Sequence, residues 1–291
     1  MDIGLVGLGK MGGNMRERLR RAGHEVVGYD TNPELADVAS VEDLVAALDV
    51  PRVVWVMVPD FVTDQVVDQV GALLSEGDIV IDGGNSKWTH DARHAEALGA
   101  RGIRFLDCGV SGGVWGLENG YALMVGGPAD AVAVAQPLFD ALKPPGDFGF
   151  VHAGEVGAGH FAKMVHNGIE YGLMQAYAEG WELLEKAGIV TNVPEVFTSW
   201  REGTVIRSWL LDLVVRALDD DAHLERIEGF AADSGEGRWT VNAAVDMGVP
   251  VPTISAALFA RFVSQQDDSP AMKMVAAMRN QFGGHAIKVE E

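Results

Sequence analysis

The stretch "IGLVGLGKMGGNM" (Ile3–Met15) decides the fold of the amino-terminal half. A short apolar run ends in Gly7-x-Gly9-x-x-Gly12, and a helical pattern follows. The first glycine permits a tight turn, the second lets a pyrophosphate approach the backbone, and the third lets helix pack on strand. The N–H groups at the start of the helix then face the phosphates. We expect a dinucleotide site whose loop residues are Gly7, Leu8, Gly9, Lys10, Met11 and Gly12.

An acidic residue completes this βαβ unit. The second β-rich run ends at Asp30, about 20 residues after the loop, where a carboxylate accepts hydrogen bonds from the adenosine ribose. A carboxylate there repels a 2′-phosphate, and Thr31–Pro33 contains no arginine to bind one, so the sequence favours NAD over NADP. The alternative is that Asp30 only starts a turn, because Asp and Asn favour turns.

The rest of the first half alternates β-rich runs with helical patterns, which is typical of a parallel sheet built from βαβ units. The single cysteine, Cys108, is expected to fill a strand position as a small apolar group. The predicted strands are Ile3–Val6, Glu25–Tyr29, Val53–Val58, Ile79–Asp82, Arg104–Asp107 and Leu123–Val125, and the helices between them include Gly12–Ala22 and Val41–Leu48.

From His160 onward apolar residues recur at helical spacing. Gly188 is expected to stop one long helix, Phe161–Ala187. Pro194 opens the next, which is predicted to run through Trp200 and Arg207 to Leu210. Further helices are expected to end at Met247, to cover Thr253–Ser264 and to begin at Pro270. The fold class is therefore an α/β Rossmann-type domain (1–157) followed by an all-α domain (158–291).

Charge and composition exclude several classes of protein. The formal net charge of −20 argues against a nucleic-acid partner, because such proteins normally present a basic face. No basic segment followed by an apolar one marks a signal peptide, and no apolar run is long enough to span a bilayer. With one cysteine no intrachain disulfide can form. We expect a cytoplasmic protein without a membrane partner.

The long helix carries polar residues at positions i, i+3, i+4 and i+7, which share one face: Lys163, His166, Asn167 and Glu170. Tyr171 borders this stripe. The apolar residues on the other faces are expected to pack into the domain: Met164, Ile169 and Leu173.

The stripe has two interpretations, a site or an ordinary solvated face of an amphipathic helix. It is not built of Glu/Lys pairs, and it follows "GAGH" (Gly157–His160), which is expected to be a flexible start after the nucleotide domain. From the spacing alone the two interpretations are balanced.

Three segments resemble one family, the decarboxylating 6-phosphogluconate dehydrogenases: "IDGGNS" (Ile81–Ser86), "GVSGGVWG" (Gly109–Gly116) and "GHFAKMVHNGIEYGLMQ" (Gly159–Gln175). Shorter pieces agree: "GEGRWT" (Gly235–Thr240), "LFAR" (Leu258–Arg261) and "RNQFGGH" (Arg279–His285). The resemblance runs from residue 2 to residue 287, and the length matches the short form of the family, which has a single helical repeat.

The resemblance implies oxidative decarboxylation of 6-phosphogluconate to ribulose 5-phosphate, with hydride transfer to NAD. By match to the family motif, Lys163 is the base that takes the proton of a secondary hydroxyl, and Glu170 is the acid that protonates the enediol carbon. The sugar's carboxylate and hydroxyls would be bound by Asn85, Ser111, Gly112, Gly113, His166 and Asn167.

The resemblance also assigns the phosphate end and the subunit arrangement. Tyr171, Arg261 and Arg279 would hold the phosphate, where arginine pairs in bidentate fashion. Arg279 and His285 would come from the neighbouring subunit, which implies a homodimer or homotetramer with shared sites. Taken alone, an arginine more often forms a surface ion pair, and Arg279 and His285 could equally cap the end of a helix.

Two regions depart from the family pattern. The phosphate loop has Ser234 and Glu236 where the long form usually has Lys and Thr, and Arg238 could offset the charge of Glu236. "MVPD" (Met57–Asp60) stands where the family usually has a small Ala-Gly pair that contacts the nicotinamide half. Met57, Val58, Pro59 and Asn85 are still expected at the nicotinamide. The connection from Asp30 to Val41 is also shorter than usual. NADP, or a deazaflavin coenzyme as hydride acceptor, is therefore an alternative.

Two further alternatives concern the function itself. A β-hydroxyacid dehydrogenase for a non-phosphorylated acid would keep Lys163 but would not need His166, Glu170 or Tyr171. A non-catalytic dinucleotide sensor would need no second proton-transfer group, so the Lys163–Glu170 pair argues against it.

Overall fold

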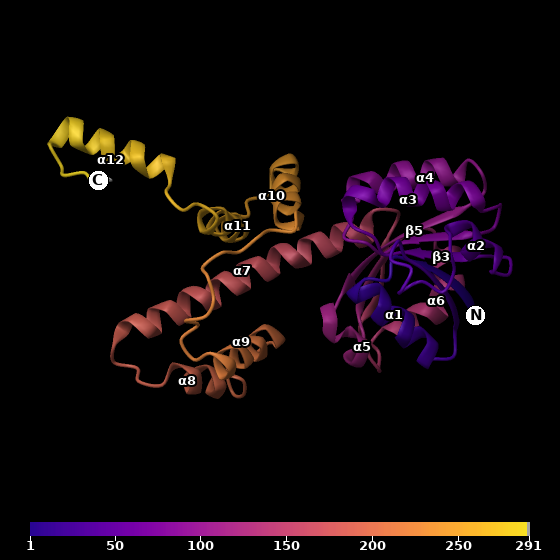
Figure 1. Cartoon of the computed structure of the whole chain (residues 1–291), viewed down its shortest axis with the longest axis horizontal. Helices are drawn as coiled ribbons and strands as arrows, with labels where there is room; N and C mark the ends of the chain where they lie inside the picture. The colour runs from indigo at the N-terminus through magenta and orange to yellow at the C-terminus, as the bar shows by residue number, and fades with distance from the viewer. Residues whose placement is uncertain (290–291) are drawn as a thin grey trace. The chain divides into compact units, whose positions relative to one another are not determined.

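The computed structural model describes residues 1–289; residues 290 and 291, at the end of the predicted helical domain, lie outside the described residues. The chain divides into two compact units, Met1–His166 and Asn167–Glu291. The sequence places the domain boundary between 157 and 158, where the long helix α7 (Ala158–Ala187) begins, whereas the compact units divide inside this helix (Figure 1).

The first unit is built on a seven-stranded sheet of order β2-β1-β3-β4-β5-β6-β7. The strands are β1 (Asp2–Val6), β2 (Glu25–Tyr29), β3 (Val53–Val56), β4 (Ile79–Asp82), β5 (Arg104–Ser111), β6 (Ala122–Gly126) and β7 (Phe150–Gly154). The expected Rossmann-type fold is confirmed. Strand β3 ends two residues early, and β7 was not expected, because its side chains are mostly exposed and the run lacks a buried pattern.

The sequence predicts a parallel sheet, but one pair of neighbouring strands in the observed sheet is antiparallel. Strands β1 to β5 are parallel, but β6 runs antiparallel to β5 with Ser111 opposite Ala122. The two are joined only by the short helices η2 (Gly113–Trp115) and α5 (Gly116–Asn119). A connection this short cannot carry the chain back to the starting edge of the sheet, so the strand direction reverses.

Helices cover both faces of the sheet (Figure 1). Strand residues alternate between two hydrophobic clusters, as in β1, where Ile3 and Leu5 face one cluster and Val6 the other. The first cluster includes residues of α1 (Lys10–Arg21) and α6 (Ala129–Leu142). The second includes residues of α2 (Val41–Ala46), α3 (Asp60–Leu73) and α4 (Asp91–Gly99). Cys108 is buried in β5, as expected.

The second unit is helical. Beyond α7 it contains α8 (Val193–Trp200), α9 (Trp209–Asp220), α10 (Glu236–Met247), α11 (Pro252–Ser264) and α12 (Pro270–Gly283). Gly188 ends α7 with φ +67°, as predicted. The single helix expected from Pro194 to Leu210 is wrong. The chain breaks after Trp200, Gly203 takes φ +78°, and the Ser208 hydroxyl caps α9 by accepting from the N–H of Leu211.

Two small cores hold this unit together. Phe197, Leu211 and Val215 pack with residues of α7, and Tyr171 of α7 packs with Ala257 and Leu258 of α11. Within residues 1–289, no helix combines the length and the apolar character that a membrane span requires.

Candidate active site

The Gly-rich loop between β1 and α1 has the geometry that its motif predicts. Gly7 has φ +95°, and a Cβ on it would lie 2.4 Å from the carbonyl oxygen of Met57. A Cβ on Gly12 would lie 2.0 Å from the oxygen of Gly7, whereas a Cβ on Gly9 would meet nothing within 4 Å. The outer glycines are thus required by packing, and the middle one faces open space at the start of α1, where a pyrophosphate fits.

Asp30 joins this loop to the end of β2. Its Oδ2 accepts a hydrogen bond from the N–H of Leu8 at 2.7 Å, and its Oδ1 accepts one from the N–H of Asn32 at 2.8 Å. The second contact is the turn contact that the sequence offered as an alternative, so one carboxylate makes the turn and also reaches the loop. Asp37 binds the nearby arginines of α1, Arg20 at 2.6 Å and Arg16 at 3.4 Å.

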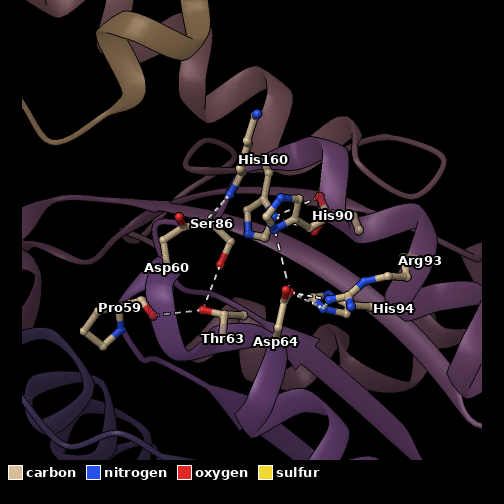
Figure 2. Close-up of polar contacts among 11 residues, drawn as sticks. Pro59, Asp60, Thr63, Asp64, Ser86, His90, Arg93, His94 and His160 are labelled. Atoms are coloured by element: carbon tan, nitrogen blue, oxygen red, sulfur yellow. Dashed lines mark hydrogen bonds and ion pairs between the residues drawn. The ribbon is translucent and has the colours of Figure 1, made fainter.

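The segments after β3 and β4 are tied to one another (Figure 2). Oδ1 of Asp60 accepts a hydrogen bond from the N–H of Lys87 at 3.0 Å. The hydroxyl of Thr63 donates to the carbonyl oxygen of Pro59 at 3.2 Å and lies 3.4 Å from the hydroxyl of Ser86. These contacts hold Met57–Asp60 beside the "IDGGNS" segment. The aspartate in "MVPD" thus takes a structural role at the start of α3.

Glycines let these segments approach closely. A Cβ on Gly84 would lie 2.7 Å from the oxygen of Val58, and one on Gly83 would lie 2.0 Å from Nε1 of Trp55. Asn85 follows them and is exposed. In the next segment, Gly112 and Gly113 have φ of +143° and +55°, so the chain turns sharply after Ser111 at the end of β5.

The first turns of α7 belong to this same unit. Asp107 of β5 caps the helix, with Oδ1 accepting from the N–H of Gly157 at 2.6 Å and Oδ2 from the N–H of His160 at 2.8 Å. A Cβ on Gly109 would lie 2.3 Å from the Cβ of Lys163, so the helix backbone lies directly against β5. The expected flexible start at Gly157–His160 is wrong, because buried hydrogen bonds fix it.

Along α7 the polar stripe is real, since the helix is continuous from Ala158 to Ala187. Lys163 is half-buried and Met164 is buried, as expected. Ile169 and Leu173 were expected to pack into the domain, but they are 53% and 46% exposed. Their side chains lie on a surface of the helix that the described residues do not cover.

The residues predicted to hold a phosphate come together in the second unit. The guanidinium carbon of Arg261 lies 3.5 Å from the centre of the Tyr171 ring. The Tyr171 hydroxyl accepts a hydrogen bond from the N–H of Ser234 at 3.2 Å, and it lies 3.4 Å from that residue's hydroxyl. A Cβ on Gly237 would lie 2.5 Å from the same ring. Arginine, tyrosine and serine therefore converge from α11, α7 and the segment before α10.

The remaining predicted residues of this unit differ in their surroundings. Both carboxylate oxygens of Asp233 bind Arg238, at 3.0 and 3.1 Å from its Nε, and Glu236 is buried. Arg279 of α12 and His285 after it are exposed, and the carbonyl oxygen of His285 accepts a hydrogen bond from the side chain of Asn280. The described structure does not bring Arg279 and His285 to the Tyr171 cluster.

Two family models match nearly the whole chain. Residues 2–144 match the NAD binding domain of 6-phosphogluconate dehydrogenase, and residues 159–290 match the 6-phosphogluconate dehydrogenase C-terminal domain. The chain is 43% identical to a putative 6-phosphogluconate dehydrogenase of Bacillus subtilis, with 99% of each chain covered. The chain belongs to the 6-phosphogluconate dehydrogenase family.

Members of this family differ in length and in the cofactor that they are named for. An NAD(+)-dependent, decarboxylating 6-phosphogluconate dehydrogenase of Haloferax volcanii is 41% identical over 99% of this chain and 98% of its own. A decarboxylating relative from Synechococcus elongatus is 38% identical over 90% of this chain and 61% of its own.

A solved 6-phosphogluconate dehydrogenase of Plasmodium falciparum, described with NADP+ and with 6-phosphogluconate, superposes with a TM-score of 0.83. It is 28% identical over 100% of this chain and 66% of its own. A 3-hydroxyisobutyrate dehydrogenase of Mycobacterium tuberculosis gives a TM-score of 0.73 at 26% identity, covering 96% of this chain and 99% of its own.

The 6-phosphogluconate dehydrogenase fold also creates a buried charged cluster that the sequence did not predict. Its members are Asp82 at the end of β4, Asp107 of β5, Asp91 and His94 of α4, and His160 of α7. Nδ1 of His160 lies 2.9 Å from Oδ2 of Asp91. One signal was visible in the sequence: Asp82 and Asp107 end predicted strands, and they are paired in register.

Proposed function

We propose that this chain catalyses the oxidative decarboxylation of 6-phosphogluconate to ribulose 5-phosphate and carbon dioxide, with hydride transfer to NAD. The observation that carries the proposal is the polar stripe on one continuous helix, with Lys163 and Glu170 two turns apart. A simple hydroxyacid dehydrogenase needs only the first of these groups. Identity above 40% to two full-length relatives supports the same reaction.

Lys163 is proposed as the base. As the neutral amine it takes the proton of the hydroxyl β to the carboxylate, while the carbon that bears the hydroxyl gives hydride to the nicotinamide. The resulting β-keto acid then loses carbon dioxide. The protonated amine stabilises the enolate oxygen that develops, an electrostatic contribution of the kind that is usually large in enzymes.

Glu170 is proposed as the acid that protonates the enediol carbon. Asn85, Ser111, Gly112, Gly113, His166 and Asn167 are proposed to bind the carboxylate and hydroxyls. The phosphate is assigned to Tyr171 and Arg261, because a guanidinium and a hydroxyl already lie together there. Ser234 is added to this group, whereas Arg238 is left out because Asp233 occupies its guanidinium.

NAD is proposed as the preferred hydride acceptor. Asp30 reaches the Gly-rich loop with its carboxylate, and Asp37 holds the two nearest arginines of α1, Arg16 and Arg20. The carboxylate of Asp30 can accept hydrogen bonds from the ribose hydroxyls, whereas Arg16 and Arg20 are already paired with an acid, which disfavours a 2′-phosphate. The glycine cradle at Gly7–Gly12 supports a dinucleotide in either case.

One assay tests the reaction and the acceptor together. The purified protein is incubated with 6-phosphogluconate and with NAD, NADP or a deazaflavin coenzyme in parallel, and reduced acceptor and carbon dioxide are both measured. We expect both products with NAD. Reduction without carbon dioxide would indicate a β-hydroxyacid dehydrogenase, and turnover with the deazaflavin alone would replace NAD as the acceptor. No turnover with any acceptor would contradict the proposal.

A second test separates the acid from the base. Glu170→Gln should slow release of ribulose 5-phosphate by about 100-fold, the range for a lost general acid. The single-turnover rate of NADH formation should change much less, because Lys163 is intact. Glu179→Gln is the control, since Glu179 lies on the same helix, where it binds Gln175 at 2.9 Å. An equal slowing of both steps would contradict the assignment of Glu170.

We also propose a homo-oligomer in which Arg279 and His285 complete a neighbouring subunit's site, and a cytoplasmic location. Mixing inactive Lys163→Met chains with inactive Arg279→Ala chains tests the sharing. Random dimers would regain about a quarter of the wild-type activity, because half of them carry one intact site. No regain after unfolding and refolding the mixture would place Arg279 outside the neighbour's site.

A further inference from the structure

The buried charged cluster lies where β4, β5, α4 and the start of α7 meet within the first unit. Asp82 ends β4 and is paired in register with Asp107 of β5, Asp91 begins α4, and His160 lies in the first turn of α7. Each of these four side chains is at most 3% exposed. His94 of α4 extends the cluster outward, with Nε2 at 2.8 Å from Oδ1 of the partly exposed Asp64 (Figure 2).

Three carboxylates surround one histidine in this cluster. Burial by itself would lower the pKa of His160, but the carboxylates of Asp82, Asp91 and Asp107 outweigh it and raise the pKa to about 10. Burial raises the pKa of Asp91 to about 7, opposed by its hydrogen bond with His160. His160 is therefore an imidazolium at neutral pH, and it is the cation around which the three acids gather.

Two acids of the cluster also fix pieces of backbone. Asp107 accepts the N–H groups of Gly157 and His160 and so caps α7. Asp82 accepts the N–H of Gly84 at 3.0 Å and so shapes the loop that leads to Asn85. The bond from His160 to Asp91 then joins α7 to α4.

Lys163 follows one helical turn after His160. Its Cβ lies against Gly109 in the middle of β5, so a small rotation of α7 would move the amine relative to Asn85 and Ser111. A residue with a side chain at position 109 would collide with the lysine, so only glycine permits this contact. The buried ion pair supplies a fixed point just before the lysine.

We propose that His160, through its buried ion pair with Asp91, is a positioning residue that sets the placement of the base Lys163. The inference rests on the proposed function of Lys163 and goes beyond it, since His160 touches no reacting atom. Nδ1 of His160 contacts Asp91 of α4, and its backbone N–H donates to Asp107 of β5. One residue therefore connects α7 to both α4 and β5.

A role in stability alone explains this cluster poorly. Among the described residues, Oδ2 of Asp82 and Nε2 of His160 are buried without a hydrogen-bond partner. Replacing a buried ion pair with well-packed apolar side chains is often neutral or stabilising. Charge retained with unsatisfied atoms at the edge of the proposed site therefore points to a role in geometry beyond any contribution to folding.

The test compares His160→Leu, Asp91→Asn and the double variant His160→Asn/Asp91→Asn with the wild-type protein. Turnover of 6-phosphogluconate is measured with substrate carrying deuterium at the carbon that gives hydride, together with NAD affinity and the folded fraction. We expect kcat to fall by about 10- to 100-fold, because a small misplacement of a catalytic group has effects of this size. The isotope effect on kcat should rise while NAD affinity stays within about twofold.

The isotope effect distinguishes a misplaced lysine from a loss of folded protein. A smaller folded fraction lowers the apparent kcat but leaves the isotope effect unchanged. The double variant restores a neutral hydrogen-bonded pair, so its kcat should be no lower than that of the worse single variant. Asp78→Asn is the matched control. Asp78 is equally buried, at the opposite end of β4, and binds Arg52. Its isotope effect should equal that of the wild type.

The outcomes are distinct. If the wild-type protein turns over but His160→Leu and Asp91→Asn match it in kcat and isotope effect at equal folded fraction, the positioning role is overturned. If His160→Leu does not fold, the isosteric Asp91→Asn decides by the same criterion. If the wild-type protein shows no turnover with any acceptor, the proposed function fails, and the positioning role falls with it.

Discussion

The two ends of strand β4 show how differently one sheet uses buried acids. At the amino end, Asp78 accepts from the backbone N–H groups of Arg52 and Ser75 and from the Arg52 guanidinium. At the carboxyl end, Asp82 accepts one backbone N–H and leaves its second oxygen unpartnered within the described residues. Both side chains are buried.

The difference follows from the topology of a parallel sheet. Loops at the carboxyl edge receive ligands, whereas the amino edge only has to close the fold. A closing contact can engage both oxygens of a buried carboxylate, as at Asp78, although Nε of its partner Arg52 is buried without a hydrogen-bond partner among the described residues. An edge that must present glycine loops, a helix start and a lysine to a ligand keeps charge that is incompletely matched.

The chemistry should depend on the carboxyl edge most strongly at Lys163. Lys163→Met should lower kcat by at least about 1,000-fold, because no neighbouring group replaces a lost base. NAD binding, measured by titration, should persist. Lys186→Met is the control on the same helix, where Lys186 is exposed and pairs with Glu182, and it should keep wild-type turnover. Substantial activity in the Lys163 variant would show that Lys163 is not the base.

The amino edge should show the opposite behaviour at Asp78. Asp78→Asn should cost about 3 kcal/mol of unfolding free energy, because it breaks a buried ion pair and leaves donors mismatched. The folded fraction should keep the wild-type kcat. Urea unfolding and turnover per folded enzyme measure the two effects. A variant that lost kcat while keeping its stability would reverse the contrast between the two edges.

The carboxyl edge should also make stability depend on pH. Since the folded pKa of His160, about 10, lies above its ordinary 6.5, its contribution is fully present below pH 6.5 and is lost as pH rises through 10. The raised pKa of Asp91 acts in the same direction at lower pH. The free energy of unfolding, measured by urea titration at each pH, should therefore fall between pH 6.5 and 10 more steeply in the wild type than in His160→Gln. Parallel profiles would show that His160 is neutral in the folded state.

The smallest expected effect concerns the cofactor loop of the same edge. Asp30→Asn keeps the hydrogen bond that Oδ1 accepts from Asn32 but removes the charge. NAD affinity should fall by about tenfold, the effect of one or two hydrogen bonds to a charged group. The ratio of NADP to NAD affinity should rise. An unchanged ratio would mean that Asp30 only shapes the turn.

Much of this fold follows from local patterns. The structure confirms the geometry of three local predictions. They are the glycine spacing at Gly7, Gly9 and Gly12, the end of α7 at Gly188, and the stripe from Lys163 to Glu170. Each depends on residues that are close together in the chain. The predictions were wrong where the local sequence pattern was weak. The break after Trp200 depends on a cap at Ser208, and the reversal of β6 depends on the length of one connection.

Near neighbours in the chain account for most of the helices and strands, for the position of the glycine-rich loop, and for the residues that share the face of α7 proposed to carry the base and the acid. The rigidity of Gly157–His160, by contrast, depends on contacts that form only in the folded protein. The residues that fix it lie 50 to 69 positions away, at Asp107 and Asp91. Burial at that meeting point removes water from the charges, and that loss of solvent turns three acids and a histidine into one coupled group.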